Sequence, residues 1–160
     1  MLTPLLVASP FAFASPSSSA SDLLALASSI SGGIYAHGVI THSATGKPVF
    51  AYEVDGFGNS LFMDDANIPS LLALPYLGFA KDDDEIYLNT REAILSRDTN
   101  PFFFKGAAGE GVGGPHAGYG MIWPMGIAVR GMTSTDEEEI STCLEMLVEA
   151  TANTGFMHER

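Results

Sequence analysis

The residues best suited to chemistry are two adjacent carboxylates, Asp64 and Asp65, with the amide of Asn67 two positions further on. Pro69 follows them and suits the first turn of a helix, where its missing N–H group is no loss. A carboxylate in that place caps free backbone N–H groups and is favoured by the helix dipole. Capping accounts for one member of the pair. The other is then available for proton transfer or for hydrogen bonds with the hydroxyl groups of a ligand.

A second group of candidates consists of histidines and one tryptophan. His116 stands in a Gly- and Pro-rich loop, of the kind that often carries binding residues. Trp123 stands beside a proline in an apolar stretch, where it either stacks on a ligand ring or fills the core. Together with the aspartate pair, His116 and His158 have the right types for metal ligands. No close-spaced histidine pair occurs, however, so we expect no metal site.

Composition and charge restrict the class of protein. A length of 160 residues is typical of one domain, and 46% hydrophobic against 16% charged residues excludes a disordered chain. The 19 acidic residues outnumber the 7 basic ones and give a formal charge of −12. Such a surface repels nucleic acid and anionic membranes but not a neutral sugar. We therefore expect no nucleic-acid or membrane partner.

The lone cysteine and the N-terminal segment leave the compartment open. Cys143 excludes an internal disulfide, and its place on the apolar face of an expected helix predicts a buried thiol. Residues 1–20 are rich in Ser, Pro and Ala, which indicates a low-complexity segment, a secretion signal or a mispredicted gene start. Ala12 and Ala14 favour a signal, whereas the missing positive charge and two prolines oppose it. No stretch approaches the ~20 apolar residues of a membrane span.

Apolar periodicity, caps and breakers predict a mainly helical chain from residue 21 to residue 160. The pattern amounts to four or five apolar helices with at most one short hairpin. Their wide apolar faces exceed what a free-standing domain of this size covers, which indicates a missing remainder. The expected elements are helices over 21–33, 69–77, 83–95 and 121–131, a last helix from a Ser134–Glu137 capping box to Asn153 or Gly155, a strand over 49–54 and a long loop over 100–120.

Four segments, in their order and spacing, make the chain resemble one known family. Residues 21–159 are similar to glycoside hydrolase family 125. The resemblance implies an (α/α)6 barrel, to which this chain would contribute about five of the twelve helices. It also implies an exo-acting α-1,6-mannosidase that inverts the anomeric carbon without a metal. The segments are 51–72 (AYEVDGFGN and MDDANIPSLL), 89–96 (NTREAILS), 122–134 (IWP to GMTS) and 154–159 (TGFMHE).

The resemblance further implies roles for particular residues. Inverting hydrolysis uses two carboxyl groups about 6.5–9.5 Å apart, one acting as acid and one as base. Glu159 matches the family's general base, and His158 would orient it; by sequence alone, Glu159 would be an exposed carboxylate near a chain end. The family's acid belongs to an upstream Arg-Pro-Ser-Asp-Asp stretch that this sequence lacks. Sugar binding is then assigned to Asp64, Asp65, Asn67, His116, Trp123 and His158.

The expected function is inverting hydrolysis of terminal α-1,6-linked mannose in an oligosaccharide or N-glycan, with no cofactor. Because the acid motif and half of the barrel are missing, the chain is expected to be a truncated and inactive portion. Its partner would be the missing N-terminal part of the barrel. Two alternatives stay open: a non-catalytic helical remnant with at most weak carbohydrate binding, and another (α/α)6 carbohydrate-active enzyme.

Overall fold

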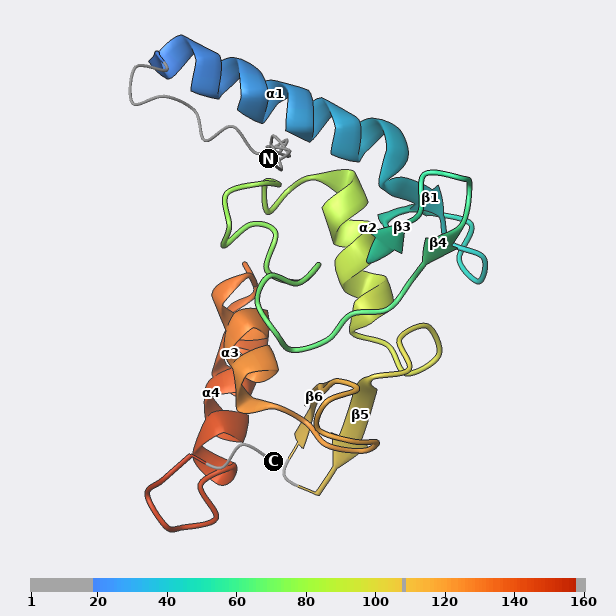
Figure 1. The fold of residues 1–160 in the computed structure, drawn as a ribbon. Helices are drawn as coiled ribbons and strands as arrows, with labels where there is room; N and C mark the ends of the chain where they lie inside the picture. The colour runs from blue at the N-terminus through green and yellow to red at the C-terminus, as the bar shows by residue number, and fades with distance from the viewer. Residues whose placement is uncertain (1–18, 108, 158–160) are drawn as a thin grey trace, which may run out of the picture.

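The computed structural model describes residues 19–107 and 109–157, in which four helices and six short strands occur. Figure 1 places α1 at one end of the molecule, α3, α4 and the β5–β6 hairpin at the other, and α2 between them. In chain order the elements are α1 (Ala20–His37), β1 (Val39–Thr41), β2 (Pro48–Phe50), β3 (Glu53–Val54), β4 (Ser60–Leu61), α2 (Glu85–Ile94), β5 (Phe103–Gly106), β6 (Gly109–Val112), α3 (Pro124–Met132) and α4 (Glu137–Glu149).

The strands form three separate antiparallel hairpins, so the expectation of at most one hairpin was wrong. β1 pairs with β2, β3 with β4, and β5 with β6 in the register Phe103↔Val112. The strand expected over 49–54 is divided between β2 and β3. The loop expected over 100–120 contains β5 and β6, because the glycine-rich sequence of β6 lacks the β-branched pattern that identifies a strand.

α2 matches its prediction closely. Asp84 caps the helix by accepting the backbone N–H groups of Ile86 at 2.8 Å and Tyr87 at 3.1 Å. Of the five residues expected to face inward, Ile86 packs against the core while partly exposed. The other four are buried: Tyr87, Thr90, Ala93 and Ile94.

Two other helical expectations were wrong in part. α1 begins at a Ser19–Asp22 capping box and continues through Gly32 and Gly33 to His37, because a glycine weakens a helix by about 1 kcal/mol without ending it. Residues 71–78 form turns instead of a helix, so the described residues contain four helices, the lower end of the expected four or five. Pro75 explains this, since a proline ring clashes with the carbonyl group four residues earlier in a helix.

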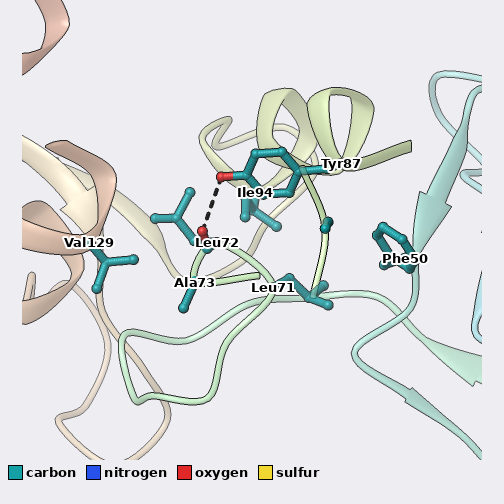
Figure 2. Close-up of a cluster of buried hydrophobic side chains, with 8 residues drawn as sticks. Phe50, Leu71, Leu72, Ala73, Tyr87, Ile94 and Val129 are labelled. Atoms are coloured by element: carbon teal, nitrogen blue, oxygen red, sulfur yellow. Dashed lines mark hydrogen bonds between the residues drawn. The ribbon is translucent and has the colours of Figure 1, made fainter. Parts of the chain in front are cut away.

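The main core joins the turns at 71–80 to α2, β2 and α3. Figure 2 shows Leu71 and Leu72 between Phe50 on one side and Val129 on the other, with Tyr87 above them. The phenol of Tyr87 donates a hydrogen bond to the carbonyl oxygen of Leu72 at 3.1 Å. The turns are therefore fixed by packing and by a buried hydrogen bond rather than by helical hydrogen bonding.

α3 and α4 form a hairpin around a second small core. Cys143 is buried there with Ile127 and Met146, as the sequence predicted for the thiol. The N-cap of α4 is Asp136, which accepts the N–H of Glu138 at 2.9 Å, and not Ser134 as expected. Ser134 instead bonds the side chain of Glu139 at 2.5 Å.

α1 stands apart from both cores. It has no buried residue, and large apolar side chains such as Leu24 (69% exposed) face solvent. Tyr35 connects the end of this helix to the body by stacking on Phe79 and by a hydrogen bond to Asp84 at 3.0 Å. Among the described helices, none is long and apolar enough to cross a membrane.

Candidate functional site

The segment that carries the two adjacent aspartates is buried. Asp64 has no exposed surface, and Asp65 is only 4% exposed. One carboxylate oxygen of Asp64 accepts the N–H of Leu71 at 2.9 Å, and the other accepts the N–H of Leu72 at 3.0 Å. Asp64 thus accepts free backbone N–H groups as the sequence predicted for one member of the pair, but it caps the turns at 71–78 instead of a helix.

Asn100 holds the same segment from the other side. Its side-chain oxygen accepts the backbone N–H of Asp64, and its amide nitrogen donates to the carbonyl oxygen of Asp64, both at 3.3 Å. The same nitrogen also donates to the carbonyl oxygen of Ile94, at the end of α2, at 3.0 Å. Because Asn100 is fully buried, these bonds attach residue 64 firmly to α2.

The environment of Asp64 favours its protonated form. Burial raises the pKa of its carboxyl group to about 7, while the hydrogen bonds from the Leu71 and Leu72 amides act in the opposite direction. The negative charge of Asp65 also contributes to the rise. A carboxyl group without a cation beside it, in a dry site, is more stable without its charge.

Asp65 is held differently. Its Oδ1 atom accepts the backbone N–H of Asn67 at 2.7 Å, and its Oδ2 atom lies 3.5 Å from the phenol oxygen of Tyr52. The side chain of Asn67 is half-buried. Burial raises the pKa of Tyr52, as do the charges of Asp65, Asp64 and Glu53, so the phenol keeps its proton.

A glycine pair brings the end of β6 against this segment. The N–H of Ala66 donates to the carbonyl oxygen of Gly113 at 2.8 Å. A Cβ atom at Gly113 would lie 1.8 Å from the carbonyl oxygen of Met121, and one at Gly114 would lie 3.2 Å from the Cβ of Asp65. The close approach at residue 113 is open only to glycine.

Trp123 and His116 lie close in the chain to the junction, that is, the contact between Gly113–Gly114 and residues 65–66. The N–H of Trp123 donates to the carbonyl oxygen of Val112 at 3.2 Å, immediately before Gly113. The indole nitrogen of Trp123 is buried and has no hydrogen-bond partner within the described residues, although the ring is half-buried overall. His116 is exposed on the loop that follows Gly114. His158 and Glu159 lie outside the described residues.

Tyr52 and Asn100 are two residues of this site that the sequence does not mark as candidates. Tyr52 belongs to a segment used for the resemblance, and no local pattern indicates that its phenol would reach a carboxylate 13 residues later. Asn100 precedes Pro101, which suggests an ordinary turn. No group of three or more His, Cys, Asp or Glu side chains suited to a metal ion occurs in the chain from 19 to 157, leaving aside residue 108.

The chain is similar to known proteins over nearly its whole length. A family described as "Metal-independent alpha-mannosidase (GH125)" matches residues 6–160. The "Meiotically up-regulated gene 157 protein" of the fission yeast Schizosaccharomyces pombe is 52% identical over 136 residues, which are 85% of this chain and 26% of that protein.

A solved structure is also similar. It is a metal-independent α-mannosidase from Streptococcus pneumoniae, in a non-productive complex with α-1,6-mannobiose. The TM-score is 0.81 at 42% sequence identity, covering 87% of this chain and 32% of that one. The chain therefore spans less than a third of the length of either relative.

Proposed function

Because this chain belongs to the metal-independent α-mannosidase family GH125, we propose that it is part of a glycoside hydrolase that releases terminal α-1,6-linked mannose with inversion. The observation that carries the proposal is the desolvated carboxylate of Asp65, held between Asn67 and the Gly113–Gly114 backbone. A sugar offers many hydroxyl donors, and buried carboxylates and amides are the groups that bind them specifically.

The two adjacent aspartates have different roles in this proposal. Asp64 has no exposed surface and both of its oxygens accept backbone amides, so it positions the segment without touching the sugar. Asp65 and Asn67 bind hydroxyl groups. Trp123 supports the sugar ring, and the exposed His116 contributes from its loop.

Catalysis is assigned to Glu159 as general base, with His158 orienting it toward a water molecule. The general acid belongs to residues outside this chain, at about 6.5–9.5 Å from the base as inversion requires. The direction of α4 supports this assignment, since the α3–α4 hairpin returns the chain toward the start of α3, next to Trp123. Residues Ala150 and Ala152 line a hollow together with Pro124, which brings the C-terminal part near the junction.

The complete fold is proposed to be an (α/α)6 barrel, of which residues 19–157 form one part. The share of the relatives' length supports this, as do the exposed apolar faces of α1 and α4. The substrate is proposed to be a mannose oligosaccharide or an N-glycan, since the pneumococcal relative is described as informative about N-linked glycan processing. Turnover then requires the remaining helices and the acid that they carry.

The experiment is a titration of the 160-residue chain with α-1,6-mannobiose, followed by ligand-observed NMR, with maltose as the control disaccharide. We expect selective binding of the mannobiose and no release of mannose. Asp65→Ala should weaken binding about ten- to hundredfold, because hydrogen bonds to a charged group contribute about 1.5–3 kcal/mol. Asp98→Ala, at an exposed aspartate, should leave the affinity unchanged. Equal binding of both sugars would refute the assignment.

A further inference from the structure

We propose that Tyr52 is a specificity-determining residue, and that its phenol and the Oδ2 atom of Asp65 bind one sugar hydroxyl group between them. The inference rests on the proposed function and adds a residue to its sugar site. It is carried by incomplete hydrogen bonding at a buried carboxylate and by the spacing of two oxygen atoms.

The carboxylate of Asp65 has unused acceptor capacity. An ionised carboxylate offers about four acceptor positions. The N–H of Asn67 fills one of them at 2.7 Å, and within the described residues Oδ2 receives only the long contact of 3.5 Å from Tyr52. Asp65 is only 4% exposed, so bulk water donates few hydrogen bonds to its carboxylate. A buried acceptor in this state has room for a further hydrogen-bond donor, either a water molecule or a ligand group.

The gap between the two oxygens has the size of a bridging hydroxyl group. A separation of 3.5 Å is long for a direct O–H···O bond, which is typically about 2.7–2.8 Å. An oxygen atom placed between them, to one side, forms a normal bond to each. The bridging group must donate to Oδ2 and accept from the phenol, and an alcohol does both. An ammonium group only donates, so it would leave the phenol proton unused.

Both partners are fixed by their backbones before any ligand arrives. The N–H of Tyr52 donates to the carbonyl oxygen of Leu61 at 2.9 Å, beside the β3–β4 hairpin. Asp65 lies between residue 64, which is bonded to Asn100, and Ala66, which is bonded to Gly113. A site built from groups held in this way loses little conformational entropy on binding. Gly114 packs closely beside Asp65, since a Cβ atom there would lie 3.2 Å from the Cβ of Asp65.

The test combines single hydroxyl deletions in the ligand with a single hydroxyl deletion in the protein. The full 160-residue chain and its variant Tyr52→Phe are titrated with α-1,6-mannobiose and with its monodeoxy analogues, and the affinities are measured by NMR. Tyr87→Phe is the matched control, because its phenol bonds the carbonyl oxygen of Leu72 in the core. Amide NMR spectra of each variant report its folding.

We expect Tyr52→Phe to weaken mannobiose binding about three- to tenfold, the usual size for one neutral hydrogen bond. One deoxy analogue should bind the parent chain and the Tyr52→Phe variant equally, because the shared hydroxyl is already gone. Tyr87→Phe should leave the affinity unchanged while lowering stability.

Two results would overturn the inference, and they differ. If the parent chain binds no mannobiose, the proposed function fails and the inference fails with it. The second result is that the parent chain binds mannobiose, but the Tyr52→Phe variant binds mannobiose and every deoxy analogue with the same affinity as the parent chain. The gap then holds a resident water only. In that case the proposed function stands and the role of Tyr52 is refuted.

Discussion

Asp64 and Glu139 are both shielded carboxyl groups, yet their surroundings act on them in opposite directions. Asp64 is surrounded by backbone amides and Asn100, with no basic side chain bonded to it among the described residues. Glu139 accepts hydrogen bonds from Arg91 at 2.6 Å, Arg130 at 2.7 Å and Ser134 at 2.5 Å. The region around Asp64 therefore has a carboxyl group without a counter-charge, and the region around Glu139 has an ion-pair network.

The pKa values follow from this difference. Burial raises the pKa of Asp64 to about 7. Burial acts in the same sense on Glu139, but the hydrogen bonds from Ser134, Arg130 and Arg91, with the charge of Arg91, hold its pKa at about 2. The charges of Glu139 and the two arginines compensate one another, so this network stabilises the packing of α2, α3 and α4. A carboxyl group kept uncompensated beside a second one is typical of a functional site.

The largest expected effect is that of Asp64→Ala. The substitution leaves the buried N–H groups of Leu71 and Leu72 without acceptors, which should lower the free energy of unfolding by about 2–4 kcal/mol. Urea unfolding of both proteins measures it. Asp55→Ala is the matched control, because Asp55 accepts only local hydrogen bonds in an exposed turn and its loss should matter far less. Equal losses would mean that Asp64 does not clamp the turns.

A smaller loss is expected for Glu139→Ala. The variant leaves two partly buried guanidinium groups without their shared carboxylate, and we expect about 1–3 kcal/mol, less than for Asp64. The control is Glu92→Ala, which breaks the exposed Lys47–Glu92 pair and should change stability by less than about 1 kcal/mol. If both variants lose the same amount, the network is a surface feature.

The third expected effect is the pH dependence of stability, in which the two groups act in opposite pH ranges. The folded-state pKa of Asp64 is raised, so its contribution is fully present below about pH 4 and is lost as the pH rises through 7. The pKa of Glu139 is lowered, so its contribution is present above about pH 4.5 and is lost as the pH falls toward 2.

Urea unfolding across pH 2–8 measures the loss of stability in both pH ranges. Asp64→Asn should flatten the loss between about pH 4 and 7, and Glu139→Gln should flatten the loss below about pH 4.5. If Asp64→Asn still loses stability between about pH 4 and 7, the assignment of that loss to Asp64 is contradicted.

Local patterns predicted much of the helical structure and the family. The spacing of Ile86, Tyr87 and Thr90 marks one face of a helix whatever surrounds it, and α2 carries that face inward. The resemblance drawn from four segments is confirmed, since the family matches residues 6–160. The predicted roles of Asp65, Asn67 and Glu159 remain predictions.

Other features were missed because they depend on pairing partners that local sequence patterns do not reveal. The glycines of β6 have no strand propensity of their own, and β6 forms by pairing with β5. Ser134 and Glu137 match a capping box in sequence, but Ser134 bonds Glu139 and Asp136 takes the cap. Glu139 is itself bound by Arg91, 48 positions away, and this long-range contact is absent from any local pattern.

By itself, the sequence determined which residues are apolar, where α2 lies, and which family the chain belongs to, because these follow from neighbours within a few positions. Only the tertiary structure decided that Asp64 is wholly buried against Asn100 and that Tyr52 lies 3.5 Å from Asp65. Those distances and the loss of solvent depend on segments up to 36 positions apart. Burial and proximity set the properties of a carboxyl group, and neither is encoded within a single segment of the chain.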